Sequence, residues 1–346
     1  MRAVLKHEAA PGLSVRDDYP DPVAGPGEAV VEIAAASLCG TDRELYEWTS
    51  SAQAFEPALP VVLGHEAAGT VVAIGDGVTS VAIGDRVALE SHLTCGRCFP
   101  CRTGNAHICE RTRLIGMHVD GVFAERVAVP EAICVPLPDG LPFEQGALLE
   151  AAGVGMHAVQ RSGLAVAGQR VLVNGGGPVG QVITRISRAL GAAQVVVVEP
   201  NPFRRQIAEQ AGADAVSPDA DIVGLCRESS GRRGGFDAAF EVSAVAGVLP
   251  TIMESLRGEA TVVTVGHPGA PVPIDVAAQI NKKGITLRGI FGRRLWDTWE
   301  QLTLLLGSGR IDLASLVTHQ LALEDADKAI ELLTGDACKV LLVPGH

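Results

Sequence analysis

The sequence has no apolar run long enough to span a bilayer, and Met1–Val15 lacks the apolar core of a secretory signal peptide. Basic residues are also few, since 28 lysines and arginines stand against 40 aspartates and glutamates and give a net charge of −12. A chain with this acidic balance is a poor match for nucleic acid or an anionic membrane. We therefore expect a cytoplasmic protein whose main partners are neither nucleic acids nor membranes.

Charged residues are scarce overall, at 20%, whereas hydrophobic residues make up 47% and glycine occupies 40 positions. This composition is typical of a well-buried α/β protein. At 346 residues the chain is too long for one ordinary core, so two domains are expected. Residues 1–150 alternate short β-like runs with turns rich in proline and glycine, which predicts a β-rich lobe.

A cluster of cysteines is the most informative stretch of that lobe. Cys95, Cys98, Cys101 and Cys109 are separated by two, two and seven residues, a spacing that lets four thiols close around one tetrahedral ion. Disulfides are the alternative, but without a secretory signal such clustering favours metal. A closed four-sulfur zinc site has no open position, so we expect it to be structural rather than catalytic.

The remaining cysteines are of two kinds. Cys134, Cys226 and Cys338 lie in apolar surroundings and are expected to be packing residues. Cys39 precedes a Gly-Thr-Asp sequence and is a candidate metal ligand only if other ligands join it.

Two further residues, His65 and Glu150, complete a candidate three-ligand set with Cys39. Glu150 lies in an otherwise apolar run, where a carboxylate needs a partner or a metal. Three protein ligands leave one position on zinc for water or substrate, which is the arrangement of a catalytic site. The three residues are far apart in the sequence, so spacing alone leaves open whether the fold joins them.

A dinucleotide-binding motif opens the second half of the chain. A buried strand at Arg170–Asn174 runs directly into a turn in which Gly175, Gly177 and Gly180 fit the pattern G-x-G-x-x-G, and a helix follows as far as Leu190. Glycines let the backbone approach a pyrophosphate, and the helix N-terminus attracts its charge. The alternative is a glycine-rich turn that binds no ligand.

An acidic residue follows at the spacing that the motif requires. A second apolar strand, Gln194–Val198, ends at Glu199, 19 positions after Gly180, where a carboxylate can bind a ribose 2′-hydroxyl. The same carboxylate would repel a 2′-phosphate, which favours NAD over NADP. Strands and helices continue to alternate after this point, so the second half is predicted to form a doubly wound parallel sheet.

The order of these motifs resembles that of the zinc-containing medium-chain alcohol dehydrogenases. The shared motifs are Cys39–Asp42, Gly64–Glu66, Gly84–Val87, the four-cysteine loop and Gly175–Gly180. The resemblance covers essentially the whole chain. Three stretches are similar to the threonine dehydrogenase branch of that family: CGTDRELYEW (Cys39–Trp48), SHLTC (Ser91–Cys95) and GIFGRRLWDTW (Gly289–Trp299).

The resemblance implies an α/β architecture of two domains. Residues 1–152 would form a GroES-like, zinc-binding catalytic domain, and residues 153–292 an inserted Rossmann domain that binds NAD. Residues 293–346 would return to the catalytic domain. The family also implies a homodimer or homotetramer.

Roles for the metal-site residues follow from the resemblance as well. It implies two zinc ions per chain, one structural and one catalytic. Cys39, His65 and Glu150 would hold the catalytic zinc, with Glu66 as an exchangeable fourth ligand. Thr41 would pass the substrate's proton toward solvent.

The resemblance implies contacts with the cofactor too. Val179 follows the glycine turn, Glu199 would bind the adenosine ribose, Arg204 would lie beside the adenine, and Val265, Gly266, Ile290 and Phe291 would flank the nicotinamide half. Lys339 stands where some members carry a cation near the pyrophosphate, although a surface lysine is the commoner explanation.

Glu44 marks a departure from the family. Many members have histidine five residues after the cysteine ligand, where it completes a proton relay. A carboxylate at this position could relay a proton, face an amino group of the substrate, or be a plain surface acid. The departure bears directly on whether threonine is the substrate.

The expected function is oxidation of a secondary alcohol in a small polar substrate, threonine- or polyol-like, to a ketone. Three other functions stay open. One is a reductase acting on a carbonyl or cyclitol-type substrate in biosynthesis. Another is a zinc-independent quinone reductase, which the complete ligand sets disfavour. The last is a catalytically silent NAD-binding protein, which the ligand set with Thr41 disfavours.

Overall fold

The computed structural model describes residues 1–163, 166–225 and 234–345, and it divides into two compact units. Unit 1 consists of Met1–Ala151, Arg294–Gly309 and Leu313–His346. Unit 2 consists of Ala152–Arg293 and Arg310–Asp312. The domain borders expected from the sequence, after residues 152 and 292, each lie one residue from a border between the units, whereas the placement of Arg310–Asp312 in unit 2 was not expected.

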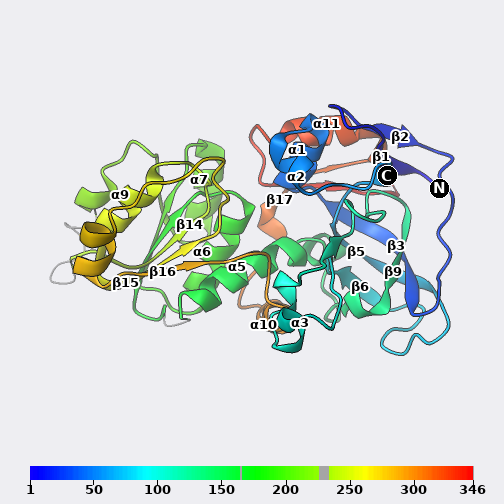
Figure 1. Cartoon of the computed structure of the whole chain (residues 1–346), viewed down its shortest axis with the longest axis horizontal. Helices are drawn as coiled ribbons and strands as arrows, with labels where there is room; N and C mark the ends of the chain where they lie inside the picture. The colour runs from blue at the N-terminus through cyan, green and yellow to red at the C-terminus, as the bar shows by residue number, and fades with distance from the viewer. Residues whose placement is uncertain (164–165, 226–233, 346) are drawn as a thin grey trace. The chain divides into compact units, whose positions relative to one another are not determined.

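Unit 1 is built around a seven-stranded sheet in the order β10-β6-β5-β3-β18-β17, with β9 paired to β3 (Figure 1). Its strands are β3 (Glu28–Ser37), β5 (Glu66–Ile74), β6 (Arg86–Leu89), β9 (Arg126–Pro130), β10 (Cys134–Pro136), β17 (Val317–Leu321) and β18 (Lys339–Leu342). Smaller sheets are formed by β1 (Ala3–Lys6), β2 (Ser14–Arg16) and β4 (Val61–Val62), and by β7 (His92–Leu93) and β8 (Arg113–Leu114).

Short helices lie around these sheets. The helices are α1 (Gly40–Glu47), α2 (Ser50–Ala54), α3 (Phe99–Arg102), α4 (Phe143–Gly146), α10 (Asp297–Gly307) and α11 (Ala326–Leu332), with 3₁₀ turns at η1 (Ala106–Ile108), η2 (Glu131–Ile133), η6 (Ala314–Leu316) and η7 (Leu323–Asp325). Helix α5 (Leu149–Arg161) begins in unit 1 and ends in unit 2. One continuous hydrophobic core takes buried apolar residues from β3, β5, β6, β18 and α11.

Strand β18 is an interior strand of the unit 1 sheet, between β3 and β17, although it comes late in the sequence. It pairs antiparallel with β3 and parallel with β17. All four of its residues are buried, including Lys339. The late segment of the chain therefore supplies one residue directly to the interior of unit 1.

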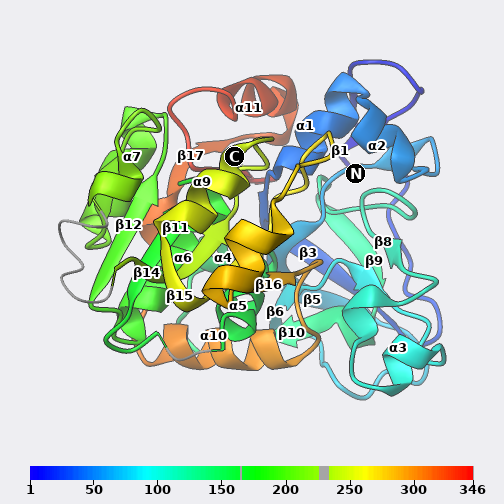
Figure 2. The same cartoon turned by 60° about the vertical axis from the view of Figure 1, so that its left-hand side comes forward.

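Unit 2 is a six-stranded, all-parallel sheet in the order β13-β12-β11-β14-β15-β16 (Figures 1 and 2). The strands are β11 (Arg170–Asn174), β12 (Gln194–Val198), β13 (Asp214–Val216), β14 (Phe236–Glu241), β15 (Leu256–Thr264) and β16 (Thr286–Gly289). Helices α6 (Pro178–Ala189), α7 (Pro202–Gln210) and α9 (Val248–Ser255) pack against them, with short turns at η4 (Val276–Ile280) and η5 (Asn281–Lys283). This strand order is that of the doubly wound nucleotide-binding fold, so the predicted fold class is confirmed.

The order reverses between β11 and β14, since the chain builds outward from β11 through β12 and β13 and then starts again at β14. Ligands bind to such sheets at this reversal, beyond the carboxyl ends of the strands. Val171, Leu172 and Val173 in β11 are fully buried, as expected for a strand covered on both faces.

Cys134 and Cys338 are buried, as expected for packing residues, whereas Cys226 lies outside the described residues. Within residues 1–163, 166–225 and 234–345, no helix is both long and apolar enough to cross a membrane.

Candidate metal sites and nucleotide pocket

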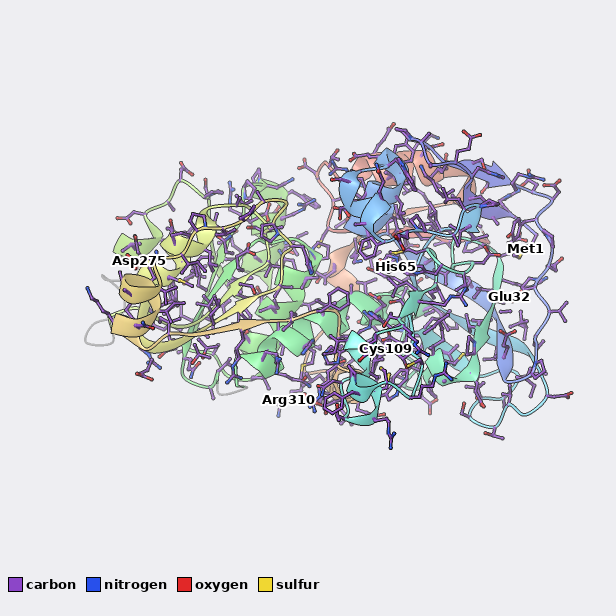
Figure 3. The ribbon with its side chains drawn as sticks, in the orientation of Figure 1. Met1, Glu32, His65, Cys109, Asp275 and Arg310 are labelled. Carbon is purple, nitrogen blue, oxygen red and sulfur yellow. The ribbon has the colours of Figure 1, made fainter. Side chains whose placement is uncertain are left out.

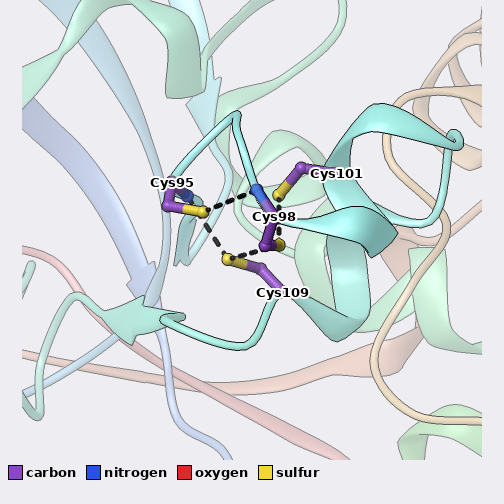
Figure 4. A group of neighbouring side chains, drawn as sticks. All are labelled: Cys95, Cys98, Cys101 and Cys109. Atoms are coloured by element: carbon purple, nitrogen blue, oxygen red, sulfur yellow. Dashed lines mark hydrogen bonds between the residues drawn. The ribbon is translucent and has the colours of Figure 1, made fainter.

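The four clustered cysteines converge on one point in unit 1. Their sulfur atoms all lie within 4.8 Å of one another (Figure 4), and none of the four forms a disulfide. The Sγ of Cys98 lies 3.4 Å from that of Cys101 and 3.8 Å from that of Cys109. Four zinc–sulfur bonds of about 2.3 Å in a tetrahedron place the sulfurs about 3.8 Å apart, so the thiols are spaced to hold zinc.

Backbone amides around the cluster favour thiolates. The N–H of Cys98 donates to the Sγ of Cys95 at 3.4 Å, and the N–H groups of Cys95 and Arg111 donate to the Sγ of Cys109 at 3.3 and 3.4 Å. Hydrogen bonds from the backbone N–H groups of Arg97 and Cys98 lower the pKa of Cys95 to about 6. Burial and the neighbouring thiols raise the pKa of Cys101 to about 12, so the cluster needs a cation before all four sulfurs can ionise together.

A second group of metal-binding side chains lies elsewhere in unit 1, around His65, which Figure 3 shows apart from Cys109. Ligand atoms of Cys39, His65 and Glu66 lie within 4.8 Å of one another. Cys39 is the residue that precedes helix α1, and Asp42 of that helix accepts a hydrogen bond from the N–H of Cys39 at 2.8 Å. Asp42 therefore fixes the start of the helix and, with it, the direction of the thiol.

The backbone before His65 is held by glycine. Gly64 has φ +87°, and an added Cβ would lie 2.3 Å from the Phe123 ring. Gly116 and Gly121 pack so closely that a Cβ on either would lie within 2.3 Å of the Gly64 carbonyl oxygen. Only glycine allows this approach, which brings the loop at Gly116 and Gly121 against the residue that precedes His65.

Several polar atoms in this group are buried without a hydrogen bond. They are Asp42 Oδ1, His65 Nδ1 and Glu66 Oε1. His65 Nδ1 lies 3.5 Å from Asp42 Oδ1, too far for a hydrogen bond with good geometry. Burial opposes the charge on His65, but the Asp42 carboxylate and the Cys39 side chain together outweigh it and raise the pKa of His65 well above its ordinary value. The group therefore attracts positive charge, and its unsatisfied donor set fits a divalent metal ion.

Lys339 is the cation of this group. Its ammonium donates to Glu66 Oε2 and, at 3.1 Å, to the carbonyl oxygen of Leu38. Burial opposes its charge, but Glu66, Cys39 and Glu150 raise the pKa of Lys339. Lys339 is thus the buried partner of Glu66 in unit 1, so it is not a surface lysine, while its expected place beside the pyrophosphate stays a prediction.

Glu150 is buried but is not one of the three residues whose ligand atoms lie within 4.8 Å. Its charge nonetheless acts on Glu66. Burial is the main cause that raises the pKa of Glu66, and the negative charge of Glu150 raises it further. The hydroxyl of Thr41 lies 3.7 Å from the Cys39 thiol. Glu44 is half-buried one helical turn after Thr41, so the two side chains share a face of α1.

The glycine turn of unit 2 is closely packed. Helix α6 begins directly after Gly177. A Cβ on Gly180 would lie 1.9 Å from the carbonyl oxygen of Gly175, so only glycine permits the helix to approach the strand end at this point. The side chain of Gln181 donates to the carbonyl oxygens of Gly176 and Arg204, which joins the turn to α7.

A cavity of about 450 Å³ lies beside this turn. It is lined by Asn174, Gly175, Gly177, Pro178, Val179, Val198, Glu199, Pro200, Arg204, Pro218, Val242, Ser243, Val245 and Val248. Glu199 is buried, and its carboxylate accepts hydrogen bonds from the N–H groups of Gly176 and Asn201 at 2.8 and 2.9 Å. The cavity therefore combines a helix N-terminus, which favours phosphate, with a fixed carboxylate.

The other predicted cofactor residues are arranged differently. Val265, Gly266, Ile290 and Phe291 do not line this cavity. The N–H groups of Val265 and Gly266 donate to the carbonyl oxygen of Glu241, and the Phe291 ring meets the His267 ring edge-on with centroids 6.1 Å apart.

Sequence reasoning missed three parts of these sites. They are Asp42, the burial of Lys339 against Glu66, and the polar pair of Asn174 and Ser243 in the cavity. A signal existed for Lys339, because a single lysine beside the apolar run Val340–Val343 predicts a buried charge that needs a partner.

Two family models match the chain. Residues 25–139 match the family described as "Alcohol dehydrogenase GroES-like domain". Residues 178–308 match the family described as "Zinc-binding dehydrogenase".

Individual relatives extend over the full chain. L-threonine 3-dehydrogenase of Symbiobacterium thermophilum is 38% identical, covering 99% of this chain and 98% of the relative. The structure of 2R,3R-butanediol dehydrogenase from Bacillus subtilis matches with a TM-score of 0.89 at 30% identity, covering 99% of each chain. A zinc-binding dehydrogenase of Sinorhizobium meliloti, solved with NADP, matches with a TM-score of 0.87 at 30% identity, again covering 99% of each chain.

Proposed function

We propose that this protein oxidises a secondary alcohol of a small polar substrate to a ketone, with NAD as the hydride acceptor. The basis is its family, since the chain belongs to the zinc-dependent medium-chain alcohol dehydrogenases. As a member of this family the protein is an oxidoreductase. The observation that carries the proposal is the set of half-buried Cys39 with buried His65 and Glu66 and their unsatisfied polar atoms, in the same chain as a nucleotide-sized cavity at a glycine turn.

The proposed metal ligands divide between two sites. Cys95, Cys98, Cys101 and Cys109 would hold a structural zinc ion. Cys39, His65 and Glu150 would hold the catalytic one, with Glu66 as an exchangeable ligand. A zinc ion bound at the second site would polarise the substrate's hydroxyl oxygen, and NAD would accept the hydride.

The chain's own residues prepare this chemistry. Lys339 holds one oxygen of Glu66, which leaves the other oxygen free to reach or leave a metal. Asp42 lies against His65 Nδ1 and thereby orients the ring. Thr41, in contact with the Cys39 thiol, is placed to accept the proton that the substrate releases, and Glu44 on the same helix face would pass it on.

The relatives' names suggest the class of substrate. Threonine and 2,3-butanediol each carry a secondary alcohol next to a carbon that bears a second polar group, an amine or a hydroxyl. We propose that this chain acts on such a 1,2-disubstituted substrate. The reductive direction on a carbonyl or cyclitol-type compound uses the same residues and is the second candidate.

We propose NAD rather than NADP because Glu199 lies in the cavity with its carboxylate fixed by two backbone amides, where it would repel a 2′-phosphate. The similar structure from Sinorhizobium meliloti was solved with NADP, so the choice between NAD and NADP has to be tested on this chain. Glu199→Ala should reduce the preference for NAD over NADP by more than about tenfold, as the loss of a charge-assisted hydrogen bond predicts. Equal use of both cofactors by the unmodified protein would contradict the assignment.

One experiment tests the function as a whole. Purified protein should contain two zinc ions per chain and should form NADH from NAD with a panel of 1,2-amino alcohols and 1,2-diols. Activity only with ketones and NADH would favour the reductase. Binding of NADH with no turnover in either direction would favour a silent binding protein.

We further propose that the protein works in the cytoplasm as a homodimer or homotetramer, with no nucleic-acid or membrane partner. Light scattering of the zinc-loaded protein measures the oligomeric state directly.

A further inference from the structure

Asn174 is a polar residue of the nucleotide cavity whose role the proposed function does not include. It is the last residue of β11 and directly precedes the glycine turn. Glu241 is the last residue of β14, and the two strands pair in parallel with Asn174 opposite Glu241. Both residues therefore lie at the reversal of strand order, where doubly wound sheets bind their ligands.

Glu241 organises the loop that follows β14. Its Oε1 accepts hydrogen bonds from the N–H groups of Ser243 and Ala244 at 2.8 and 3.0 Å, and it lies 2.6 Å from the Ser243 hydroxyl. Ala244 has φ +57°, a conformation that non-glycine residues adopt at a cost. An oxygen that already accepts two N–H groups acts as an acceptor toward the hydroxyl as well, so Ser243 donates its only proton to Glu241.

The direction of this hydrogen bond determines the orientation of the Asn174 amide. The Ser243 oxygen also accepts from the N–H of Val245 at 3.2 Å and lies 3.0 Å from Nδ2 of Asn174. Because the hydroxyl proton is already donated to Glu241, Ser243 can only accept from Asn174. The amide must therefore present its NH₂ group to Ser243 and its carbonyl oxygen, Oδ1, to the other side.

That carbonyl oxygen has no protein partner among the described residues, since the only hydrogen bond of the side chain is the one to Ser243. Although Asn174 is only 6% exposed, Oδ1 is not among the fully buried polar atoms that lack a partner, so it keeps access to solvent. Asn174 thus offers one oriented, unused hydrogen-bond acceptor to the cavity.

The position of this acceptor indicates which part of a dinucleotide it meets. Glu199 follows β12 and Ser243 follows β14, and these strands lie on opposite sides of β11. If Glu199 binds the adenosine ribose, Asn174 faces the half of the cofactor beyond the pyrophosphate. A carbonyl oxygen repels phosphate and needs a donor, and a ribose hydroxyl is the donor adjacent to the pyrophosphate on that half.

We propose that Asn174, oriented by Glu241 through Ser243, binds a hydroxyl of the second ribose of the cofactor. The proposal rests on the proposed function in that the cavity takes a dinucleotide. Asn174 touches the ligand directly, whereas Ser243 and Glu241 are positioning residues that act through it.

Binding of three ligands to the zinc-loaded protein tests the proposal. NADH and ADP-ribose contain the second ribose, and ADP lacks it. Asn174→Ala should weaken NADH and ADP-ribose about three- to tenfold, as expected for one neutral hydrogen bond, and leave ADP within about twofold. Ser243→Ala should have a similar selective effect, and the double variant should bind no more weakly than Asn174→Ala alone, because the two residues act as one unit.

Asp237 supplies the matched control. It is a buried carboxylate on β14, the strand that ends at Glu241. At the opposite end of that strand it accepts hydrogen bonds from the N–H of Arg170 and from Nε of Arg257. Asp237→Asn should leave all three affinities unchanged even if it lowers thermal stability. If the alanine variants do not fold, the similarly sized Asn174→Leu variant replaces them, because it removes the carbonyl acceptor of residue 174 without leaving a large void, and it should give the same selective loss.

Equal weakening of ADP and ADP-ribose by Asn174→Ala would overturn the proposal, as would unchanged affinity for all three ligands. Additive losses in the double variant would overturn the positioning role of Ser243. If the unmodified protein binds none of the three ligands, the proposed function fails instead.

Discussion

At the scale of single residues, the metal site depends on charges that the sequence places far apart. Glu66, Glu150 and Asp42 bring carboxylates to buried positions, and Lys339 is the cation that pairs with Glu66. Residue type singled out Cys39, His65 and Glu150 as candidates, because cysteine, histidine and a carboxylate in an apolar run bind metals, but spacing left open whether the fold joins them. It could not predict Asp42 and Lys339, whose roles depend on contacts that only the fold creates.

Glu44 provides the first prediction. Glu44→Gln should lower kcat by about 10²-fold if the carboxylate transfers the proton that Thr41 receives, because an amide cannot accept and release a proton at neutral pH. Zinc content and KM for NAD should stay unchanged. Stopped-flow measurement of NADH formation across pH 5–9 checks the prediction.

Glu47 is the control for this prediction. It lies on the same helix, is exposed, and pairs with Arg43 at 2.8 Å. Glu47→Gln should keep full activity and the same pH profile. If Glu44→Gln behaves like Glu47→Gln, Glu44 is a surface acid, and the relay uses another group.

At the scale of elements, strands β11 and β12 of unit 2 were predicted with their bounds, because each is an apolar run bounded by clear turns, whereas the short strand β13 was not predicted. Helices α1 and α5 were not predicted. Helix α5 contains Gly153 and Gly155, which discourage helix assignment. The structure gives the reason for both glycines, since an added Cβ would lie 2.6 Å from Arg293 and 2.7 Å from Val182, respectively. Contacts between residues so far apart in the sequence leave no signal in the sequence around the two glycines.

The cysteine lobe carries the second prediction. Cys98→Ser should remove one of two zinc ions and lower the melting temperature by roughly 5–15 °C, because metal binding contributes directly to folding here. Metal analysis combined with thermal denaturation measures both effects. Cys134→Ala, at a buried cysteine outside the cluster, should retain two zinc ions. A Cys98→Ser protein with two zinc ions and an unchanged melting temperature would show that the lobe holds no structural metal.

The β1-β2-β4 sheet gives a prediction for pH. Tyr19 donates its hydroxyl proton to Asp120 at 2.8 Å, and Asp120 also accepts from the N–H of Val62 in β4. Burial, together with this hydrogen bond and the Asp120 charge, raises the pKa of Tyr19 from 10.0 to about 12. The folded state therefore holds the proton more tightly than the unfolded chain. The resulting stability is fully present below about pH 10 and is lost as the pH rises toward 12.

Tyr19→Phe isolates this effect. The variant should be less stable than the unmodified protein at pH 8.5, and the difference should narrow at pH 11. Urea unfolding midpoints at the two pH values measure it. A stability difference that is the same at both values would mean that Tyr19 does not titrate in this range.

At the scale of the whole molecule, the two units carry different proposed sites, since the candidate metal ligands lie in unit 1 and the cavity at the glycine turn lies in unit 2. We therefore expect calorimetry to resolve two transitions. NADH at 100 times its Kd should stabilise one of them by about 2.7 kcal/mol, and removal of zinc by a chelator should lower the other. A single transition that responds equally to both treatments would show that the units unfold together.

The position of β18 has a consequence for how the protein is made. Residues 339–342 form an interior strand of the unit 1 sheet and supply the cation that pairs with Glu66. A ribosome synthesises β3, β5, Cys39 and the four-cysteine cluster long before it reaches residues 339–342. It completes unit 2 after those early segments and before β18. The nascent chain must therefore keep a gap beside β3 open during translation, and the proposed catalytic metal site gains its counter-charge only after the sheet of unit 2 has been synthesised.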